Sequence, residues 1–507
     1  MQKRALLSAS DKTGLPDFAR ALQKMGWEIV STGGTKALLE KQGIAVTSVE
    51  SVTGFPECFS GRVKTMHPLL MGAILFRRDL PEHQAQAEKN GIRPIDLVCV
   101  NLYPFEKTAA DKSKTDAEII EQIDIGGPTL LRSAAKNHAA VTVVCDPADY
   151  DRVLTELKKN KTTSPELRNE LAAKVFVHTA AYDMRIAEYF GMNRGLMLVG
   201  GQTLRYGENP HQWGEYYGLY KSNENISAPA SWGTMHQGKA LSYLNILDAD
   251  AAWTAILDFD APTSVFVKHA NPSGIASHEN IDEAFQRAYD TDRLSAFGVI
   301  IAINKKCTAA IAQKIIDQKM FVEVIVAPVY DDQALEILKQ KPNIRVISQS
   351  NQPINQSTNY RSVMGGMLVQ NPDTKIVTEK DLTIVTSKKP TADQVRDLLF
   401  AWKAVKHAKS NAIVFAKDQV TAGIGAGQTS RVDSTWIAAR RAGERAKGAV
   451  MASDAFFPFP DSVEEASKHG ITAIIQPGGS VKDADVFAKA EELGMVMVTT
   501  GVRAFRH

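Results

Sequence analysis

The chain has 507 residues, too many for a single hydrophobic core, so we expect two to four domains. Hydrophobic residues make up 44% of the chain and charged residues 23%, the ordinary balance of a globular protein in water. The 59 Lys and Arg against 57 Asp and Glu leave a net charge of only +2, which argues against the basic excess typical of nucleic-acid binders.

The four cysteines are Cys58, Cys99, Cys145 and Cys307, and they form no C-x-x-C pair. This spacing argues against a disulfide framework and a cysteine-rich zinc site, and it is typical of a reducing cytosol. No apolar run reaches the roughly 18 residues of a membrane span, and the first residues lack the apolar region of a signal peptide. We therefore expect a cytoplasmic protein without a membrane partner.

Strand and helix patterns alternate over the first 150 residues, which is typical of a parallel sheet with helices on both faces. We expect this first domain to end near residue 150. The predicted strands lie at 5–7, 27–30, 44–49, 95–100 and 139–145, and the predicted helices at 15–25, 36–42 and 129–136.

Two loops of this domain, SASDKTG and STGGTK, each place hydroxyls, glycine and a lysine directly before a helix. Backbone N–H groups, the positive end of a helix dipole and a cation then converge, which suits a phosphate group. Ser and Thr before a helix are also ordinary N-caps, so the loops alone leave both interpretations open. The candidate phosphate ligands are Ser10, Lys12, Thr13, Ser31, Thr32, Gly33, Gly34 and Thr35.

Two later segments add cations and hydrogen-bonding groups. In GRVKTMHP, Arg62 and Lys64 project to one side of an extended segment beside Thr65, although a solvated basic turn is the alternative. The segment NLYPF presents Asn101 and Tyr103 where a strand ends. Both segments are expected at the ligand edge of the sheet.

The segment DIGGPTLLRSAAKNH supplies Asp124, the glycine pair Gly126 and Gly127, and Lys136. A helix cap is the alternative role of Asp124. We expect one sheet edge to carry a set suited to acid/base work on a phosphorylated substrate, namely Lys64, Tyr103, Asp124 and Lys136.

A long helix should follow, because Ser164 is a good N-cap and Pro165 suits the first helical position. From Leu167 onward, apolar residues recur at spacings of three and four and form one stripe. His178 and Tyr182 lie on this stripe, and we interpret them as packing residues. The helix should connect the two halves of the chain.

The segment FVKHANP in the second half sets two proton-handling side chains next to each other. Residues 263–267 predict a short buried strand, and Pro272 keeps Asn271 out of helical geometry. Lys268 and His269 then fall at the carboxyl end of a strand, where open α/β sheets collect their ligands. The fragment alone favours the alternative of a solvated lysine beside a core histidine, because structural histidines and surface lysines are common.

The sequence does not match three other known motifs, namely the P-loop, the dinucleotide-binding glycine motif and the zinc-deaminase motif. GTMHQGKA has Ala240 where a P-loop needs Ser or Thr, and GIGAGQ has Gln428 in place of a third glycine. The Lys417–Asp418 turn before the latter predicts an antiparallel hairpin. The H-x-E and P-C-x-x-C motifs of zinc deaminases are absent, so we predict no catalytic metal.

Long segments resemble one known family throughout the chain and in the right order. SDKTG, STGGT, TGFPE, GRVKT, NLYPF, QIDIGGPTLLRSAAKNH and VTVVCDPADY resemble the inosine monophosphate (IMP) cyclohydrolase domain of bifunctional purine biosynthesis enzymes. The formyltransferase domain of the same family acts on aminoimidazole carboxamide ribonucleotide (AICAR). The segments of this chain that resemble that formyltransferase domain are LRYGENPHQ, GKALSYLN, FVKHANPSG, LSAFG, SNAIVFAKDQVTAGIGAGQTSRVDS and SDAFFPFPDS.

The resemblance implies an α/β fold with a methylglyoxal-synthase-like parallel domain at 1–150 and a helical connector at 151–198. A cytidine-deaminase-like α/β/α region of two subdomains should occupy 199–507. The implied function is the last two steps of IMP biosynthesis. A formyl group passes from the cosubstrate 10-formyltetrahydrofolate to AICAR, and the formyl-AICAR then loses water and closes its second ring.

For formyl transfer, the resemblance implies His269 as the base for the amine proton, because neutral imidazole dominates at physiological pH. Lys268 either stabilises the developing charge or protonates the leaving folate nitrogen, and the sequence does not separate these roles. Asn411 matches the asparagine of the family. For ring closure, which of Lys64, Tyr103, Asp124 and Lys136 is acid and which is base stays open.

The remaining residues implied by the resemblance are binding residues. Arg205 and Arg503 match positions that contact the nucleotide phosphate, which suits the planar guanidinium. Ala504 departs from the family pattern, in which many relatives have His, and we expect an effect on tail packing only. Positions that line the nucleotide and folate site match Tyr206, Asn245, Phe297, Gly298, Glu323, Arg431 and Phe457.

The family also implies a homodimer with an apolar interface in the second half and, as an open possibility, a structural monovalent cation. Two other functions stay open from the sequence. The first domain could be a regulatory phosphate-binding module, or the whole chain an inactive binding scaffold, although the latter conflicts with an intact Lys268, His269 and Asn411.

Overall fold

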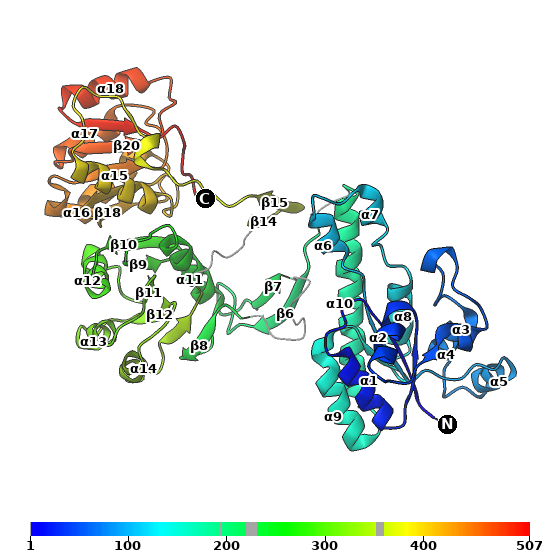
Figure 1. Cartoon of the computed structure of the whole chain (residues 1–507). Helices are drawn as coiled ribbons and strands as arrows, with labels where there is room; N and C mark the ends of the chain where they lie inside the picture. The colour runs from blue at the N-terminus through cyan, green and yellow to red at the C-terminus, as the bar shows by residue number, and fades with distance from the viewer. Residues whose placement is uncertain (1, 192–194, 220–230, 351–358) are drawn as a thin grey trace. The chain divides into compact units, whose positions relative to one another are not determined.

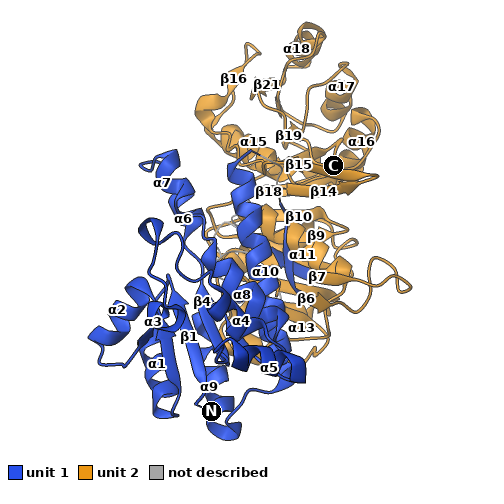
Figure 2. Cartoon of the chain, turned by 90° about the vertical axis from the view of Figure 1, so that its right-hand side faces the viewer, with its two compact units in different colours: residues 1–201, 217–230 blue, residues 202–216, 231–507 orange. Residues whose placement is uncertain are grey.

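The computed structural model describes residues 2–191, 195–219, 231–350 and 359–507. The chain divides into two compact units, each considered by itself (Figure 2). The first unit holds the residues up to 201 and the segment that begins at 217, and the second holds residues 202–216 and 231–507.

The first unit is built on a five-stranded sheet in the order β3-β2-β1-β4-β5, and every neighbouring pair is parallel. Apolar side chains of β1 and β4 are buried on both faces, as parallel strands covered by helices require. The predicted parallel α/β domain is therefore confirmed. The strands are β1 Arg4–Ala9, β2 Glu28–Ser31, β3 Thr47–Ser48, β4 Leu97–Asn101 and β5 Thr142–Val144.

The described residues of the first unit form ten α-helices. Most of them cover the sheet, whereas α6 and α7 lie apart from it, with α6 against α10 (Figure 1). The predicted strand at 44–49 is shorter than expected, because the Ser48 side chain accepts a hydrogen bond from Ser51 N and caps α3. The helices are α1 Leu15–Lys24, α2 Gly33–Lys41, α3 Val49–Thr53, α4 Pro68–Leu75, α5 Pro81–Lys89, α6 Phe105–Ala110, α7 Asp116–Ile120, α8 Gly126–Lys136, α9 Tyr150–Asn160 and α10 Pro165–Tyr189.

The long helix α10 begins where the sequence predicts, with the Ser164 side chain accepting a hydrogen bond from Leu167 N. It packs against α8 and β5, so it lies within the first unit. The Lys174 ammonium, buried on this helix, forms ion pairs of 2.7 Å with both Asp146 and Asp149. The three-part division into 1–150, 151–198 and 199–507 stays a prediction.

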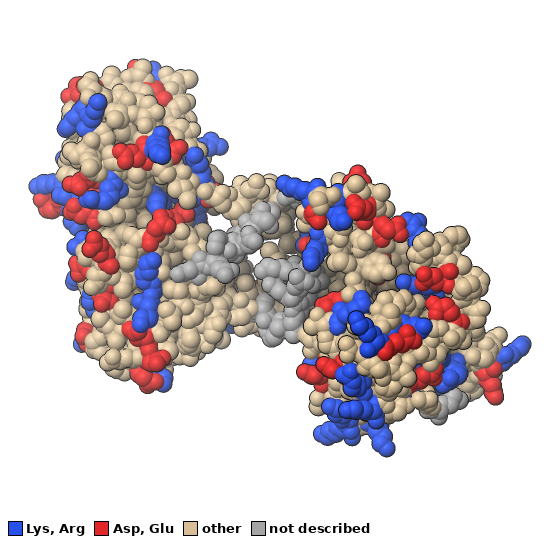
Figure 3. Space-filling model, viewed as in Figure 1, with Lys and Arg blue, Asp and Glu red and all other residues tan. Residues whose placement is uncertain are grey.

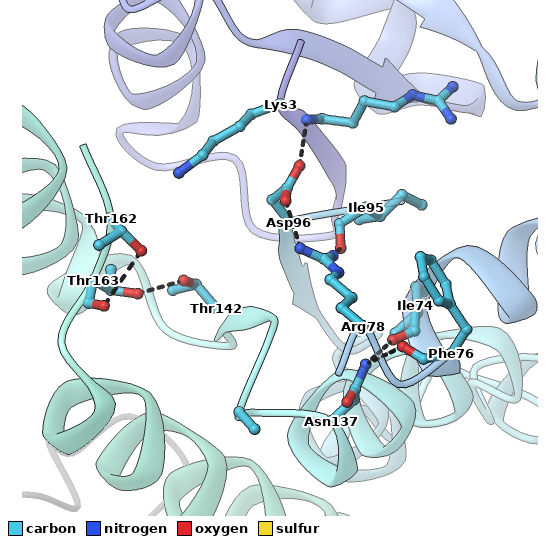
Figure 4. A network of polar contacts seen from close by, with 12 residues as sticks. Lys3, Ile74, Phe76, Arg78, Ile95, Asp96, Asn137, Thr142, Thr162 and Thr163 are labelled. Carbon is cyan, nitrogen blue, oxygen red and sulfur yellow. Dashed lines mark hydrogen bonds and ion pairs between the residues drawn. The ribbon is translucent and has the colours of Figure 1, made fainter. Parts of the chain in front are cut away.

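A polar network ties together the edge of the sheet where β1 and β4 begin (Figure 4). The Asp96 carboxylate accepts hydrogen bonds from Arg4 N at 2.9 Å and from the Arg78 guanidinium at 2.6 Å. The Asn137 side chain donates to the carbonyl oxygens of Ile74 and Phe76 at 2.7 and 3.1 Å. The other edge, where the strands end, carries the loops that the sequence assigns to ligands.

The second unit contains a twelve-stranded mixed sheet in the order β16-β21-β20-β19-β17-β18-β10-β9-β11-β12-β13-β8. It therefore has the predicted α/β composition, with a large sheet and helices that cover it. Its strands are β8 Thr234–Gln237, β9 Thr263–Lys268, β10 Asn271–Ser277, β11 Val299–Ile303, β12 Val322–Ala327, β13 Arg345–Ser348, β16 Thr383–Ile384, β17 Ile413–Lys417, β18 Val420–Gly425, β19 Val450–Ser453, β20 Ala473–Gln476 and β21 Val496–Thr499.

Eight α-helices of the described chain accompany this sheet, and two short ribbons complete the structure. The helices are α11 Tyr243–Ile256, α12 Ile281–Thr291, α13 Ala309–Asp317, α14 Asp332–Leu338, α15 Ala392–Val405, α16 Arg431–Ala442, α17 Asp461–Lys468 and α18 Asp483–Glu492. The ribbons pair β6 Leu198–Thr203 with β7 Glu215–Leu219, and β14 Asn359–Val363 with β15 Gly366–Gln370.

The large sheet repeats one arrangement twice. In one half a β9–β10 hairpin is followed by the parallel strands β11, β12 and β13 and by the antiparallel edge strand β8. In the other half the β17–β18 hairpin is followed in the same way by β19, β20, β21 and β16. The halves meet where β10 pairs with β18.

Strand register makes the two halves comparable residue by residue. Val265 of β9 pairs with Ala302, and Val414 of β17 pairs with Ala452. The segments VFVKHANPSG and VFAKDQVTAG, at 265–274 and 414–423, therefore correspond without a gap.

The surface and the helices of the described chain agree with its composition. No described helix is both long and apolar enough to cross a membrane. On the visible face of each unit, cationic and anionic side chains are interspersed, in keeping with the net charge of +2 (Figure 3).

Candidate active sites

A cavity of about 530 Å³ lies at the edge of the first sheet where β1 and β4 end. Its lining comes from the loop after β1, the start of α2, the segment before α4, the loop after β4 and the start of α8. Twelve of the predicted site residues line it, namely Ser10, Lys12, Gly34, Thr35, Arg62, Lys64, Thr65, Asn101, Tyr103, Asp124, Gly126 and Gly127.

Two side chains hold the first loop in place. The Asn101 side-chain oxygen accepts hydrogen bonds from the backbone N–H groups of Ser10 and Asp11, at 2.6 and 2.8 Å. Thr35 Oγ1 both accepts from Ala9 N and donates to Ala9 O, at 3.1 Å each. Asn101, predicted as a ligand residue, therefore also has a structural role.

Cationic groups converge on the amino end of α2. A Cβ atom built on Gly33 would lie 3.6 Å from Lys64 Nζ, so this ammonium sits beside the first residue of the helix. Gly33 also has a φ of 53°, in the left-handed region that favours glycine. With Lys12 in the same lining, the cavity offers two ammonium groups and a positive helix end, which suit an anion.

Asp124 is held at the start of α8. Its carboxylate accepts a hydrogen bond from Gly127 N at 2.7 Å, which explains why this helix begins three residues before the predicted residue 129. A Cβ on Gly127 would lie 2.4 Å from Asp124 Oδ2, so only glycine fits there. Burial raises the pKa of Asp124, and the N–H groups of Gly127 and Tyr103 and the charge of Lys64 oppose this shift.

Tyr182 of α10 forms a hydrogen bond with the backbone of Asp124. The Tyr182 hydroxyl accepts a hydrogen bond from Asp124 N at 2.8 Å and donates one to Gln122 O at 2.9 Å. Burial raises the pKa of Tyr182 to about 12. Tyr182 was predicted as a packing residue, and the apolar stripe on which it lies gives no signal of this polar contact.

Lys136 does not join the cavity, contrary to the sequence-based prediction. It is the exposed last residue of α8, about 15 Å from Gly126 at a rise of about 1.5 Å per residue. Its neighbour Asn137 bonds to Ile74 and Phe76 in the network at the opposite edge (Figure 4). Lys136 and Asp124 belong to one sequence segment, but α8 carries Lys136 from the cavity to the opposite edge of the sheet.

Four of the eight predicted phosphate ligands are also absent from the cavity lining. Ser31 is fully buried and donates to Leu7 O at 2.6 Å, and Thr32 is buried as well. Thr13 Oγ1 bonds to Asp11 at 2.7 Å, and Gly33 serves the turn before α2. Lining residues that the sequence did not indicate include Ser8, Ser60, Gly61, Met66 and Glu121.

In the second unit, Lys268 and His269 lie at a hairpin turn. Strand β9 ends at Lys268, and the two-residue turn of His269 and Ala270, with φ of 55° and 56°, leads into β10. The predicted strand and its end are confirmed, but the partner strand β10 is antiparallel. His269 is exposed, and Lys268 Nζ donates to Phe297 O at 2.7 Å.

Asn411 belongs to the same edge of the sheet. Asn271, directly after the turn, accepts a hydrogen bond from Lys409 N at 2.9 Å, which links the turn to the segment before Asn411. The Asn411 amide donates to the carbonyl oxygens of Gln428 and Thr429, at 3.0 and 3.1 Å. Both amide hydrogens are thus bound within the free chain.

Arg431, the first residue of α16, completes this group. One guanidinium nitrogen donates to Asn411 Oδ1 at 2.8 Å and to the fully buried Asp454 carboxylate at 2.9 Å. The backbone of Asp454 in turn accepts from Ala504 N at 2.8 Å, which brings the tail with Arg503 to this group. Ala504 is buried and packs in the hydrophobic core of the second unit.

A second cluster of predicted binding residues surrounds the segment before α11. Arg205 donates to the Tyr206 hydroxyl at 2.6 Å, and Arg205 N donates to Leu241 O. The Arg345 guanidinium bonds to Glu323 and, at 3.1 Å, to Ala240 O. Arg205 is thus bonded to this segment directly, and Glu323 is linked to it through Arg345.

Three more predicted binding residues have clear structural settings. Phe297 is exposed and its ring packs against Phe321 at 4.8 Å, next to Gly298 with a φ of 71°. Asn245 is buried and forms a capping box with Ser242 at the start of α11. Phe457 has no exposed surface and lies in the hydrophobic core, so the prediction that it lines the site is not supported.

The described residues contain no group of three or more His, Cys, Asp or Glu side chains suited to a metal ion. The chemical groups at both sites are instead ammonium, imidazole, carboxylate, phenol and backbone amides. These can hold an anion, move protons and stabilise a developing negative charge.

Comparisons with known proteins match two family models and a solved structure. A family model described as "AICARFT/IMPCHase bienzyme" matches residues 134–441, and one described as "MGS-like domain" matches residues 14–129. A solved structure described as "Crystal structure of ForH" is 37% identical, covers 38% of this chain and 100% of its own, and superposes with a TM-score of 0.35.

Curated relatives match over the full length of the chain. The "Bifunctional purine biosynthesis protein PurH" of Bacillus thuringiensis subsp. konkukian (strain 97-27) is 49% identical, with 100% of both chains covered. The protein of the same name from Bacillus cereus (strain 03BB102) gives the same identity and coverage. The chain therefore belongs to the AICARFT/IMPCHase bienzyme family, the bifunctional formyltransferase and cyclohydrolase enzymes of the last two steps of purine biosynthesis.

Proposed function

We propose that the two reactions of this enzyme occur at separate sites, one in each unit. The observation that carries the proposal is the segregation of the proton-transfer groups. Lys64, Tyr103 and Asp124 line one cavity in the first unit, whereas Lys268 and His269 share a turn in the second. We assign ring closure to the cavity and formyl transfer to the turn.

Formyl transfer uses a formyl-folate cosubstrate, which we take to be 10-formyltetrahydrofolate. His269 accepts a proton from the AICAR amine while the amine nitrogen bonds to the formyl carbon. The bond from that carbon to the folate nitrogen then breaks. Lys268, 2.7 Å from Phe297 O in the free chain, stabilises the oxyanion or protonates the leaving nitrogen.

Ring closure follows when the carboxamide nitrogen of formyl-AICAR bonds to the formyl carbon and water leaves. Lys64 and Tyr103 are suited to stabilise the developing oxyanion and to protonate the leaving oxygen. Asp124, fixed by Gly127 and Tyr182, is suited to receive the carboxamide proton. Holding the reacting groups in contact supplies much of the acceleration for such a unimolecular step.

Phosphate recognition at the first site is proposed for the loop after β1 and the start of α2. Lys12 and Lys64 contribute charge, and Gly34 and Thr35 at the start of α2 bring backbone N–H groups to the cavity. At the second site Arg205 and Arg503 are the candidates for the phosphate. The candidates for the rest of the nucleotide and the folate are Tyr206, Phe297, Gly298, Glu323 and Arg431.

We also propose that the enzyme is a cytoplasmic homodimer, in which the apolar surface of the second unit is paired. The β14–β15 ribbon supports this, because Met364, Met367 and Leu368 are exposed large apolar side chains on one short hairpin. Light scattering that gives the mass of one chain would contradict it. A structural monovalent cation remains part of the proposal.

Two variants test the separation of sites. His269→Ala should abolish formyl transfer and leave the cyclisation of supplied formyl-AICAR within about twofold of wild type. Asp124→Asn should do the reverse. If either folded variant loses both activities, the sites are not separate. If Asp124→Asn cyclises normally, the cavity has another function, such as regulatory phosphate binding.

A further inference from the structure

The two hairpins of the large sheet are built in the same way around a buried aspartate. The Asp248 carboxylate of α11 accepts hydrogen bonds from the backbone N–H groups of His269 and Ala270, at 3.1 and 2.8 Å. In the other half, the Asp397 carboxylate of α15 accepts from Asp418 N and Gln419 N, both at 2.8 Å. The two aspartates are 8% and 6% exposed.

The lysine before each turn is repeated as well. Lys268 Nζ donates to Phe297 O at 2.7 Å, and its counterpart Lys417 donates to Lys447 O at 3.3 Å. In each half the accepting residue precedes a glycine with positive φ, 71° and 75° respectively. The buried aspartate and the lysine bond are therefore parts of a shared framework.

The side chain that opens the turn is the functional difference between the two copies. His269 occupies the position that Asp418 occupies in the other half. Only the first hairpin therefore carries an imidazole on this framework. The two hairpins therefore allow the structural role of the buried aspartate to be separated from its effect on an imidazole.

The aspartate matters because the turn is conformationally unfavourable. Four non-glycine residues, His269, Ala270, Asp418 and Gln419, have φ between 53° and 56°, where Cβ crowds the backbone. Two charge-assisted hydrogen bonds to one carboxylate oppose that cost. Since the backbone of His269 sets the direction of its Cα–Cβ bond, the carboxylate also fixes the point and direction from which the imidazole extends.

We propose that Asp248 is a positioning residue for formyl transfer: it holds the turn of His269 and Ala270 so that the imidazole faces the reacting amine. Asp397 makes the same bonds in a turn without an imidazole and contributes to stability only. The inference rests on the proposed role of His269 as the base. Burial raises the pKa of both aspartates, in keeping with their equivalent settings.

The test compares Asp248→Asn with Asp397→Asn in the full-length chain. Both changes remove the charge and set an amide against a backbone N–H, so both should lower the thermal unfolding temperature by a similar amount. Asp248→Asn should lower kcat for formyl transfer by at least about tenfold, with KM for AICAR within about twofold. Asp397→Asn should leave kcat within about twofold, and both should cyclise formyl-AICAR normally.

Equal kcat values in the two folded variants would overturn the inference, because Asp248 would then act on stability alone. His269→Ala is measured alongside: if it retains formyl transfer, the proposed function fails, and not merely this inference. Should Asp248→Asn not fold, Asp248→Glu retains the charge but displaces the carboxylate. The same loss of kcat is expected there, and a wild-type kcat would overturn the inference.

Discussion

At the scale of single residues, the environment of Asp124 decides what the first site can do. The sequence identifies this carboxylate from the glycines that follow it, and Gly127 indeed allows its contact with the helix start. The sequence does not reveal Tyr182, because that residue lies 58 positions away on an apolar helix stripe. Periodicity predicts which side chains are buried, not which of them form hydrogen bonds.

Replacing Tyr182 with Phe removes the hydroxyl that accepts from Asp124 N and leaves this N–H unpaired. A lost hydrogen bond of about 1 kcal/mol corresponds to about fivefold in rate, so cyclisation should slow by about that factor while formyl transfer is unchanged. Steady-state assays of both reactions measure the effect.

Tyr189→Phe is the matched control on the same helix. Its hydroxyl donates to the exposed Asp116 at 2.6 Å, away from the residues that line the cavity. Cyclisation at the wild-type rate in Tyr182→Phe, or an equal loss in Tyr189→Phe, would show that the contact with Asp124 does not serve the reaction.

At the scale of elements, hydrophobic pattern predicts the strands well and their ends less well. Strand β9 and the antiparallel β17–β18 hairpin occur where they are predicted. The turn at His269 has no glycine, and the Asp248 carboxylate that holds it comes from a helix 21 residues earlier. Lys136 shows the same limit, because a residue at the far end of α8 cannot reach a cavity at its start.

Close contact between helix and hairpin in the second unit depends on glycine. A Cβ on Gly274 would lie 2.1 Å from Ala288 O of α12, and one on Gly423 would lie 2.1 Å from Ala438 O of α16. Gly274→Ala and Gly423→Ala should each destabilise the protein by about 1–3 kcal/mol, because α12 or α16 must move away.

Chemical denaturation followed by circular dichroism measures this loss. Gly366→Ala on the exposed β15 strand is the control, since a Cβ added there would meet no heavy atom of the described chain within 4 Å. If Gly274→Ala and Gly366→Ala have the same midpoint, the helix does not pack on the hairpin in this way.

At the scale of the whole molecule, strand and helix alternation predicts the parallel sheet of the first unit, and the family resemblance predicts the composition of the second. The repeat within the large sheet is much harder to find. Only four of the ten residues in VFVKHANPSG and VFAKDQVTAG are identical, and strand register is needed to align them. Because a core position accepts many apolar residues, two copies of one structure can have little sequence identity.

The division of labour between the units is tested most directly by producing residues 1–198 and 199–507 as separate proteins. Each fragment, once shown to be folded by circular dichroism, is assayed for formyl transfer and for the cyclisation of formyl-AICAR. We predict that the first fragment only cyclises and that the second only transfers the formyl group. Both activities in one fragment, or the reverse assignment, would contradict separate sites.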